Sequence, residues 1–182
     1  MSDRYIDFAN SSLGQRMVGA LGLPTPVRLE RWQAGRLRPV EGALLIGGGA
    51  LAEKVSAFAN RLTDAIFSYG TEPAPEKATA WIPGHGPKLK AVVFDASELN
   101  QTDALKQLRE FFQPLMKNLD HNAHLVILGR DPQNVRDPFA ASAQRALEGF
   151  SRSLAKELRG GGTLQLIQVG EGAEEQLEGP LR

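Results

Sequence analysis

The chain alternates short apolar runs with longer stretches in which apolar residues recur every three or four positions. The short runs are bounded by Gly, Pro or polar residues, as is typical of strands that are buried on both faces of a parallel sheet. The expected strands are Ala43–Ile46, Ala78–Ile82, Ala91–Phe94, His124–Leu128 and Thr163–Val169.

Amphipathic stretches lie between several of these runs and predict helices. The expected helices are Leu51–Phe67, Thr102–Leu119 and Pro138–Leu158. Pro114 predicts a kink or a break in the second helix, because proline lacks the N–H that a helix needs. Strands that alternate with helices indicate an α/β fold. We expect a doubly wound, mostly parallel sheet of about five strands, of the degenerate Rossmann or flavodoxin-like type.

Residues 1–42, before the first strand, have a different pattern and predict an N-terminal helical arm. The apolar residues of its helix recur every four positions: Leu13, Met17 and Leu21. Gly22 and Pro24 then end this helix. The sheet domain is expected over residues 43–170. Residues 171–182 are polar and predict a linker to a further, C-terminal domain.

Composition narrows the classes of function. Lys and Arg total 21, as do Asp and Glu, so the formal net charge is zero, which disfavours a nucleic-acid binder. The absence of cysteine excludes disulfides, thiolate catalysis and Cys-ligated metal centres. No apolar run approaches the roughly 20 residues that span a bilayer, and the N-terminus lacks the apolar part of a signal peptide. We therefore expect a cytoplasmic protein without nucleic-acid or membrane partners.

The loop after the first strand is the first candidate site, because ligands of doubly wound sheets bind beyond the carboxyl ends of the strands. Gly47, Gly48 and Gly49 would let the backbone approach a pyrophosphate at a helix N-terminus. The dinucleotide fingerprint G-x-G-x-x-G would place its third glycine at Ala52, where alanine is sometimes accepted. A tight strand-to-helix turn explains the same glycines, and we favour this interpretation.

The other loops predict no catalytic set. Asp95 follows a strand and could hold a ribose, a metal or a water, although a single carboxylate is more often an Asx turn or a helix cap. Arg130 and Asp131 offer a charge pair without a nucleophile. The histidines are spaced for neither a shared metal site nor a Ser–His–Asp triad: His85, His121 and His124. We expect no catalytic residues and no metal site.

One segment of the last helix resembles a known family. Ala143–Leu158 is similar to the long helix of short-chain dehydrogenase/reductases, in particular of 3-oxoacyl-[acyl-carrier-protein] reductases, and Leu147–Leu158 follows it without a gap. Ser2–Asn10 and Leu21–Pro24 resemble the N-terminal domain of the large, two-domain members. The resemblance implies that the whole chain is such a domain, which precedes a complete NADPH-dependent ketoreductase domain.

The same resemblance places the family's catalytic motifs on residues that lack the chemistry. The proton-donating tyrosine falls on Ala140 and the lysine on Gln144, which offer neither the proton nor the charge. The catalytic serine has no counterpart before the helix. The glycine-rich cofactor loop is reduced to Gly47–Gly49. The resemblance thus implies no cofactor in this segment and NADPH in the intact parent.

Three functions follow as hypotheses. The first is a non-catalytic N-terminal domain of a 3-oxoacyl-acyl-carrier-protein reductase, which serves assembly and substrate approach. Its partners would be its own C-terminal reductase domain, a second copy in a homodimer, and acyl carrier protein. The alternative is a divergent NADP-binding short-chain reductase that is active on its own. A flavin-binding electron-transfer protein is suggested by the fold only, and Gly47–Ala50 lacks the hydroxyl-rich phosphate loop of flavodoxins.

The resemblance also predicts a dimer interface. In the family, two helices form a four-helix seam, and they correspond to Thr102–Leu119 and Pro138–Leu158. The expected interface residues recur every three or four positions along the second helix: Leu147, Phe150, Ser151 and Leu154. The opposing interpretation is that this face only covers its own sheet.

Overall fold

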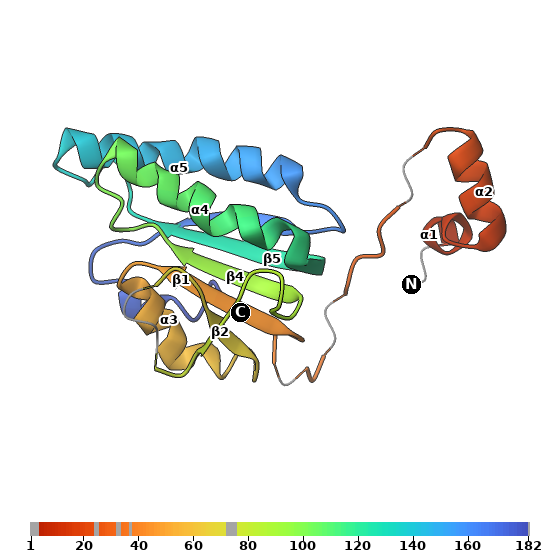
Figure 1. The fold of residues 1–182 in the computed structure, drawn as a ribbon, viewed down its shortest axis with the longest axis horizontal. Helices are drawn as coiled ribbons and strands as arrows, with labels where there is room; N and C mark the ends of the chain where they lie inside the picture. Colours follow the sequence, from red (N-terminus) through yellow and green to blue (C-terminus); the bar gives the residue numbers. More distant parts are fainter. Residues whose placement is uncertain (1–3, 24–25, 32–33, 37, 72–75, 182) are drawn as a thin grey trace. The chain divides into compact units, whose positions relative to one another are not determined.

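The computed structural model describes residues 4–23, 26–31, 34–36, 38–71 and 76–181. It consists of two compact units, Met1–Gln33 and Ala34–Arg182. In the larger unit, six parallel strands form one sheet in the order β3-β2-β1-β4-β5-β6 (Figure 1). This is the strand order of the doubly wound Rossmann arrangement, so the predicted fold class is confirmed, with one strand more than expected.

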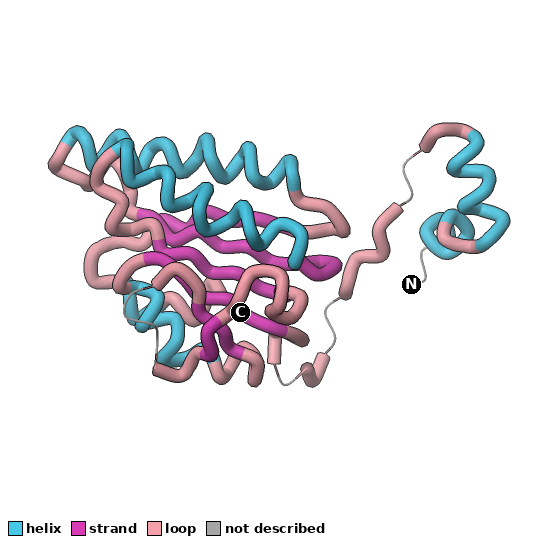
Figure 2. Tube along the Cα trace, viewed as in Figure 1, coloured by secondary structure: helices cyan, strands magenta, loops and turns pink. Residues whose placement is uncertain are grey.

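The strands vary greatly in length, and the longest lie at the centre of the sheet. Their bounds are β1 Ala43–Gly48, β2 Ile66–Ser68, β3 Thr79–Ala80, β4 Leu89–Asp95, β5 Leu119–Gly129 and β6 Thr163–Gln168. Every residue of β4 is buried, as expected for a strand covered on both faces. Figure 2 shows the strands stacked between two layers of helix and loop.

The helices cover the sheet from both sides. Their bounds are α3 Leu51–Ala59, α4 Lys106–Leu115 and α5 Pro138–Glu157, with 3-10 turns η1 Thr102–Leu105, η2 Met116–Asn118 and η3 Glu174–Gln176. Helices α4 and α5 lie on one face and α3 on the other (Figure 1). No helix in the described part of the chain is both long enough and apolar enough to cross a membrane.

The helix expected over Leu51–Phe67 is wrong in its second half, because α3 ends at Ala59 and β2 follows. Thr63 makes the turn between them: its hydroxyl donates to the carbonyl oxygen of Gly42 at 2.6 Å and accepts from the N–H of Ala65 at 3.2 Å. The apolar residues of β2 continue the helical period of α3. Periodicity alone therefore could not separate the helix from this short strand.

The expected helix over Thr102–Leu119 is shorter than predicted. It begins with η1, and its α-helical part ends at Leu115, one residue after Pro114, where η2 begins. This is the break that the proline predicts, since its nitrogen cannot donate to the preceding turn. Leu119 is the first residue of β5, which starts before the predicted His124.

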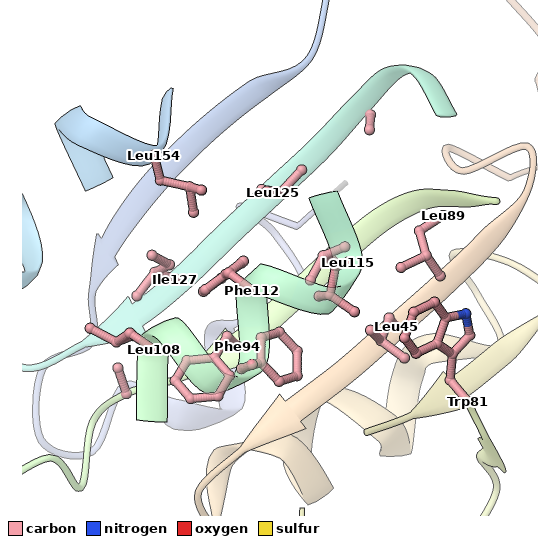
Figure 3. Packing of buried hydrophobic residues seen from close by; sticks show 14 of the residues in the cluster. Leu45, Trp81, Leu89, Phe94, Leu108, Phe112, Leu115, Leu125, Ile127 and Leu154 are labelled. Atoms are coloured by element: carbon pink, nitrogen blue, oxygen red, sulfur yellow. The ribbon is translucent and has the colours of Figure 1, made fainter. Parts of the chain in front are cut away.

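Two apolar clusters hold the sheet between its helical layers. Against α4 and α5, the rings of Phe94 and Phe111 lie 4.5 Å apart and those of Phe111 and Phe112 lie 5.0 Å apart. Figure 3 shows Phe94 and Phe112 between α4 and the sheet. Aromatic rings packed at such distances add to the stability gained from burial alone. The second cluster lies against α3 and includes Leu177, from the segment after β6.

The segment expected to be a linker packs on the larger unit as far as residue 181. Leu177 is only 2% exposed within the second cluster. Lys54 and Arg61 form ion pairs with Glu175 and Glu178, respectively. The described part of this segment thus belongs to the compact unit, while the predicted domain boundaries stay a prediction.

The smaller unit contains α1 Arg4–Ala9 and α2 Ser12–Ala20. Ser11 caps α2, because its hydroxyl accepts from the N–H of Gly14 at 3.1 Å. Leu13, Met17 and Leu21, which define the predicted apolar face, are exposed. Pro24, the second predicted stop signal, lies outside the described residues.

Candidate functional site

The carboxyl edge of the sheet has a topological switch point between β1 and β4. From β1 the chain continues into α3 on one face, and from β4 it continues into α4 on the other (Figure 1). Ligands of open α/β sheets bind in the crevice that such a divergence leaves. Gly47–Leu51 and Asp95–Glu98 are the two loops that meet here.

Asp95, the last residue of β4, joins these two loops. Its Oδ2 accepts a hydrogen bond from the N–H of Leu51, the first residue of α3, at 2.7 Å. Its Oδ1 accepts from the N–H of Ser97 at 2.9 Å. A carboxylate is favourable at a helix N-terminus because the free N–H groups there carry partial positive charge. The interpretation of Asp95 as a helix cap and Asx turn is therefore confirmed.

The surroundings of Asp95 shift its acidity. The residue is 2% exposed, and burial raises the pKa of its carboxyl group above the ordinary value. Hydrogen bonds from Ser97 and Leu51 oppose this shift, while the negative charge of Glu98 adds to it. The carboxyl group of Asp95 therefore takes up a proton at a higher pH than a free aspartate does.

Internal contacts account for the three glycines of the first loop. A Cβ atom at Gly47 would lie 2.2 Å from Cε2 of Phe111, and one at Gly48 would lie 2.1 Å from the carbonyl oxygen of Asp95. Gly48 also has a φ of +96°, which residues with side chains rarely adopt. A Cβ atom at Gly49 would lie 2.8 Å from Glu98 Oε2 and 2.9 Å from Asp95 Oδ2. No ligand is needed to explain these glycines.

The same contacts decide how well this loop fits the pyrophosphate of a dinucleotide. The N–H groups of Gly49 and Leu51 would face such a group, but both already donate to Asp95, at 3.0 and 2.7 Å. The carboxylates of Asp95 and Glu98 converge on Gly49. Two negative groups at this point repel a pyrophosphate rather than attract it. In this arrangement the residues do not fit the cofactor.

Gln144 lies nearby on α5, where the resemblance placed a lysine, and it is 3% exposed. Its Nε2 donates to the carbonyl oxygens of Ala96 at 2.8 Å and Leu99 at 2.9 Å. Its Oε1 accepts from the backbone N–H of Arg130 at 2.7 Å. The amide thus ties α5 to the loops that follow β4 and β5. This structural role has no signal in the sequence, because all of its partners are distant main-chain groups.

Ala140, where the resemblance placed the tyrosine, lies in the first turn of α5. Its N–H donates at 2.8 Å to Asp137 Oδ2, which caps the helix. Pro138 follows this cap in the first helical turn, where proline is favoured because its missing N–H has no helical partner. Neither Ala140 nor Gln144 can donate a proton to a carbonyl substrate, so the geometry offers no replacement for the family's catalytic pair at these positions.

Arg130 lies at the end of β5, but Asp131 is not its partner. Its Nη1 donates to Glu174 Oε1 at 2.8 Å and to the carbonyl oxygen of Val169 at 3.1 Å. The pKa of Glu174 is lowered, mainly by a hydrogen bond from its own backbone and further by Arg130. Asp131 instead closes a turn by accepting from the N–H of Gln133 at 3.0 Å. Arg130 therefore fastens η3 to the end of the sheet.

The residues expected at a dimer interface face the protein's own sheet. Leu147 and Leu154 belong to the first apolar cluster, and Ser151 is buried beside them. The half-buried ring of Phe150 lies 5.7 Å from that of Phe112 on α4. The opposing interpretation thus describes these side chains better, because a buried face offers no surface to a second copy. The homodimer itself stays a prediction.

The histidines do not form a common site. His85 is exposed in the loop before β4, and His121 and His124 both belong to β5. His124 Nδ1 lies 2.9 Å from the hydroxyl oxygen of Thr163 on β6. Within the described ranges, no three His, Asp or Glu side chains are grouped closely enough to hold a metal ion.

Comparisons with known proteins give a fold but no family. No family model matches the chain, and no curated protein matches it. Two similar solved structures are of BdcA. BdcA in complex with NADPH has a TM-score of 0.53 and 18% identity, over 72% of this chain and 71% of that chain. BdcA (YjgI) from E. coli has a TM-score of 0.53 and 19% identity, over 79% of this chain and 89% of that chain.

These findings correct the expectation drawn from the resemblance of the last helix. The chain is not supported as the N-terminal domain of a 3-oxoacyl-acyl-carrier-protein reductase, because two similar solved structures are of BdcA and neither a family model nor a curated protein identifies it as such a domain. The pattern of one amphipathic helix and of two short N-terminal segments, Ser2–Asn10 and Leu21–Pro24, was too local to identify the whole chain. At 18–19% identity, the neighbours show that the larger unit has the Rossmann-like fold of BdcA, whose structure was determined with NADPH.

Proposed function

We propose that this chain is a divergent, non-catalytic protein of the reductase fold, in which the protein's own carboxylates occupy the place of the cofactor's pyrophosphate. The observation that carries the proposal is the 2.7 Å hydrogen bond from the N–H of Leu51 to Asp95 Oδ2. In a dinucleotide-binding protein the N-terminus of this helix is offered to the cofactor. Here the position is taken by a buried internal anion.

The groups around this edge support the same conclusion. Reduction of a carbonyl by NADPH needs a bound nicotinamide and a proton donor. Phe111 packs against Gly47, so an aromatic side chain fills space beside the first strand. Both the Nε2 and the Oε1 of Gln144 form hydrogen bonds with main-chain groups, so its amide is not available to a ligand. The residues that would bind or react instead stabilise the loops.

A second candidate is a divergent NADP-binding reductase, and one observation favours it. The structural neighbour BdcA was solved with NADPH, and this chain keeps a glycine turn before α3. Binding would require the carboxyl group of Asp95 to leave the N–H of Leu51. The raised pKa of Asp95 eases this step at low pH, because a neutral carboxyl group repels a pyrophosphate less.

A titration with NADPH separates the two candidates. Binding is followed by calorimetry and by the fluorescence of Trp81, whose ring lies 5.7 Å from that of Tyr69 just after β2. NADPH oxidation with small diketones is measured in parallel. The proposal predicts no saturation up to about 1 mM, where binding is worth only about 4 kcal/mol, and no turnover. Saturable binding with turnover would establish the second candidate instead.

A double variant tests whether charge excludes the cofactor. Asp95→Asn with Glu98→Gln removes both negative charges while it preserves the shapes of the side chains. We expect this variant to bind NADPH more tightly than the wild type does. Glu110→Gln with Glu148→Gln removes two exposed charges on α4 and α5, away from the N-terminus of α3, and serves as the matched control. If neither pair changes binding, the exclusion comes from packing around Gly47 rather than from charge.

A further inference from the structure

The amino end of β5 contains an irregularity that the fold itself does not require. Leu89 of β4 pairs with Leu119 of β5, and the next pair joins Ala91 to His124. Between these pairs β4 contributes only Lys90, whereas β5 contributes residues 120–123. The longer strand must therefore arch away from its neighbour. Bulges of this kind redirect side chains and are frequent beside functional sites.

Buried groups hold this arch in place. Asn122 has a φ of +53°, the only positive φ among the described residues other than glycine. Its N–H donates to the carbonyl oxygen of Gly160 at 2.8 Å. On the other side, the ammonium group of Lys90, a residue only 5% exposed, donates to the carbonyl oxygen of His121 at 2.6 Å. Asparagine adopts this left-handed conformation more readily than other residues with side chains, and the two hydrogen bonds from distant parts of the chain hold the arch in this form.

A half-open groove of about 650 Å³ lies against the arch, at the amino edge of the sheet. Its apolar lining comes from three elements: Met116 of η2, Leu119 of β5 and Leu154 of α5. Leu154 lies between α5 and β5 in Figure 3. The volume falls within the range of small-molecule sites, which are mostly apolar with a few placed polar groups.

The rim of the groove carries more cationic than anionic groups. The cationic residues that line it are Lys88, Lys117 and Arg159, the anionic ones are Asp120 and Glu157, and His121 of the arch also lines it. Lys88 Nζ donates to the carbonyl oxygen of Lys117 at 2.7 Å. In the part of the chain that the structure describes, neither Lys117 nor Arg159 forms an ion pair. Two cations beside an apolar surface complement a ligand that is anionic at one end.

We propose that this groove binds a small organic anion with an apolar body, such as an alkyl carboxylate or alkyl phosphate. The anionic head pairs with Lys117 and Arg159, and the body covers Met116, Leu119 and Leu154. Binding buries apolar surface and gives both cations a partner, so the anionic head and the apolar body of the ligand both contribute to its affinity. The groove lies at the opposite edge of the sheet from Asp95. The proposal is therefore independent of whether the protein binds NADPH.

Decanoate is the probe that tests binding to this groove. It is titrated into the full chain in low-salt buffer, and two-dimensional NMR spectra report the binding. We expect saturable shifts of the His121 ring and Leu154 methyl signals. Acetate has the charge without the body, and decyltrimethylammonium has the body with the opposite charge. Each should bind at least about tenfold more weakly than decanoate. Equal binding of the cationic probe, or no saturation by decanoate, would overturn the proposal.

Charge-reversal variants assign the site. Lys117→Glu with Arg159→Glu should weaken decanoate binding at least about tenfold, because the head then meets like charge. Lys106→Glu with Arg109→Glu makes the same change of net charge at two exposed positions of α4 and should leave binding unchanged. Thermal unfolding confirms that both variants fold. An equal loss in the two variants would refute the site, because it would show a response to net charge alone.

Discussion

The carboxylate of Asp95 lies 2.7 Å from the backbone nitrogen of Leu51, so the end of β4 caps the helix that follows β1. The two residues belong to neighbouring strand–helix connections, and the parallel pairing of β1 with β4 brings them together. One buried side chain thus fixes the geometry of the switch point. It also fills the position at which a Rossmann-like protein presents N–H groups to a phosphate.

Asp95→Ala should lower the free energy of unfolding by about 2–4 kcal/mol, because the N–H groups of Leu51 and Ser97 lose their acceptor. Urea unfolding at neutral pH measures the change. Asp103→Ala removes an exposed carboxylate in η1 and should change stability by less than about 0.5 kcal/mol. Similar losses in the two variants would contradict the capping role of Asp95.

The raised pKa of Asp95 predicts a pH dependence with a definite sign. The folded protein holds the Asp95 proton more tightly than the unfolded chain, whose pKa is near the ordinary value of 3.8. The contribution of Asp95 to stability is therefore fully present below pH 3.8 and is lost as the pH rises through the raised pKa. Asp95→Asn carries no charge at any pH and lacks this dependence.

We therefore expect Asp95→Asn to become more stable relative to the wild type as the pH rises through that window, so that its free energy of unfolding increases relative to that of the wild type. Urea unfolding of both proteins at a series of pH values measures it. A difference that stays constant, or that falls as the pH rises, would show that burial does not govern the acidity of Asp95.

Gln144→Leu should be strongly destabilising although it preserves the volume of the side chain. It leaves the carbonyl oxygens of Ala96 and Leu99 and the N–H of Arg130 without their partner, at an expected cost of about 3 kcal/mol or more. Denaturant unfolding provides the measurement. Gln113→Leu, at an exposed position of α4, should be nearly neutral, and equal effects would show that the buried hydrogen bonds matter little.

The sequence predicted the central strands and the main helices because their apolar patterns are long and their boundaries are marked. Asp137 and Pro138 mark the start of α5, and Pro114 marks the end of α4. The pattern failed at β2, where a short strand continues the period of α3. It also could not reveal the arch in β5, because the partners that hold Asn122 and His121 are distant in sequence.

The candidate site was predictable only where the role of a residue depends on its local sequence. The run of glycines was recognised as a turn, and Asp95 was recognised as a capping residue, because both roles are local preferences of those residue types. The partner of Asp95 was not predictable, since Leu51 lies 44 positions away and meets it only through strand pairing. Likewise, nothing in the sequence indicates which main-chain groups the amide of Gln144 reaches.

Leu147 provides a test of whether α5 covers its sheet or a second copy. It is 1% exposed and packs closely over Gly129, where an added Cβ atom would lie 2.7 Å from Leu147 Cδ1. Leu147→Ala should cost about 2–5 kcal/mol of unfolding free energy. Phe139→Ala, at a position that is 70% exposed, should cost far less. Urea midpoints that depend on protein concentration, with a mass that halves in Leu147→Ala, would instead favour a dimer seam.

Two glycines with opposite surroundings give the last prediction. Gly48 has a φ of +96°, and a Cβ atom there would lie 2.1 Å from the carbonyl oxygen of Asp95, which is main chain and cannot move aside. Gly48→Ala should therefore destabilise the protein by at least about 2 kcal/mol, since it adds a steric clash to an unfavourable backbone conformation. Gly149 lies in α5 with no atom within 4 Å of an added Cβ.

Gly149→Ala should instead stabilise the protein by about 0.5–1 kcal/mol, because alanine favours the helix more than glycine does. Thermal and urea unfolding of the two variants should thus shift in opposite directions. A Gly48→Ala variant as stable as the wild type, or more stable, would mean that the turn after β1 can relax around a side chain. In that case the glycines could serve a ligand after all, because the internal contacts of the turn would no longer account for them.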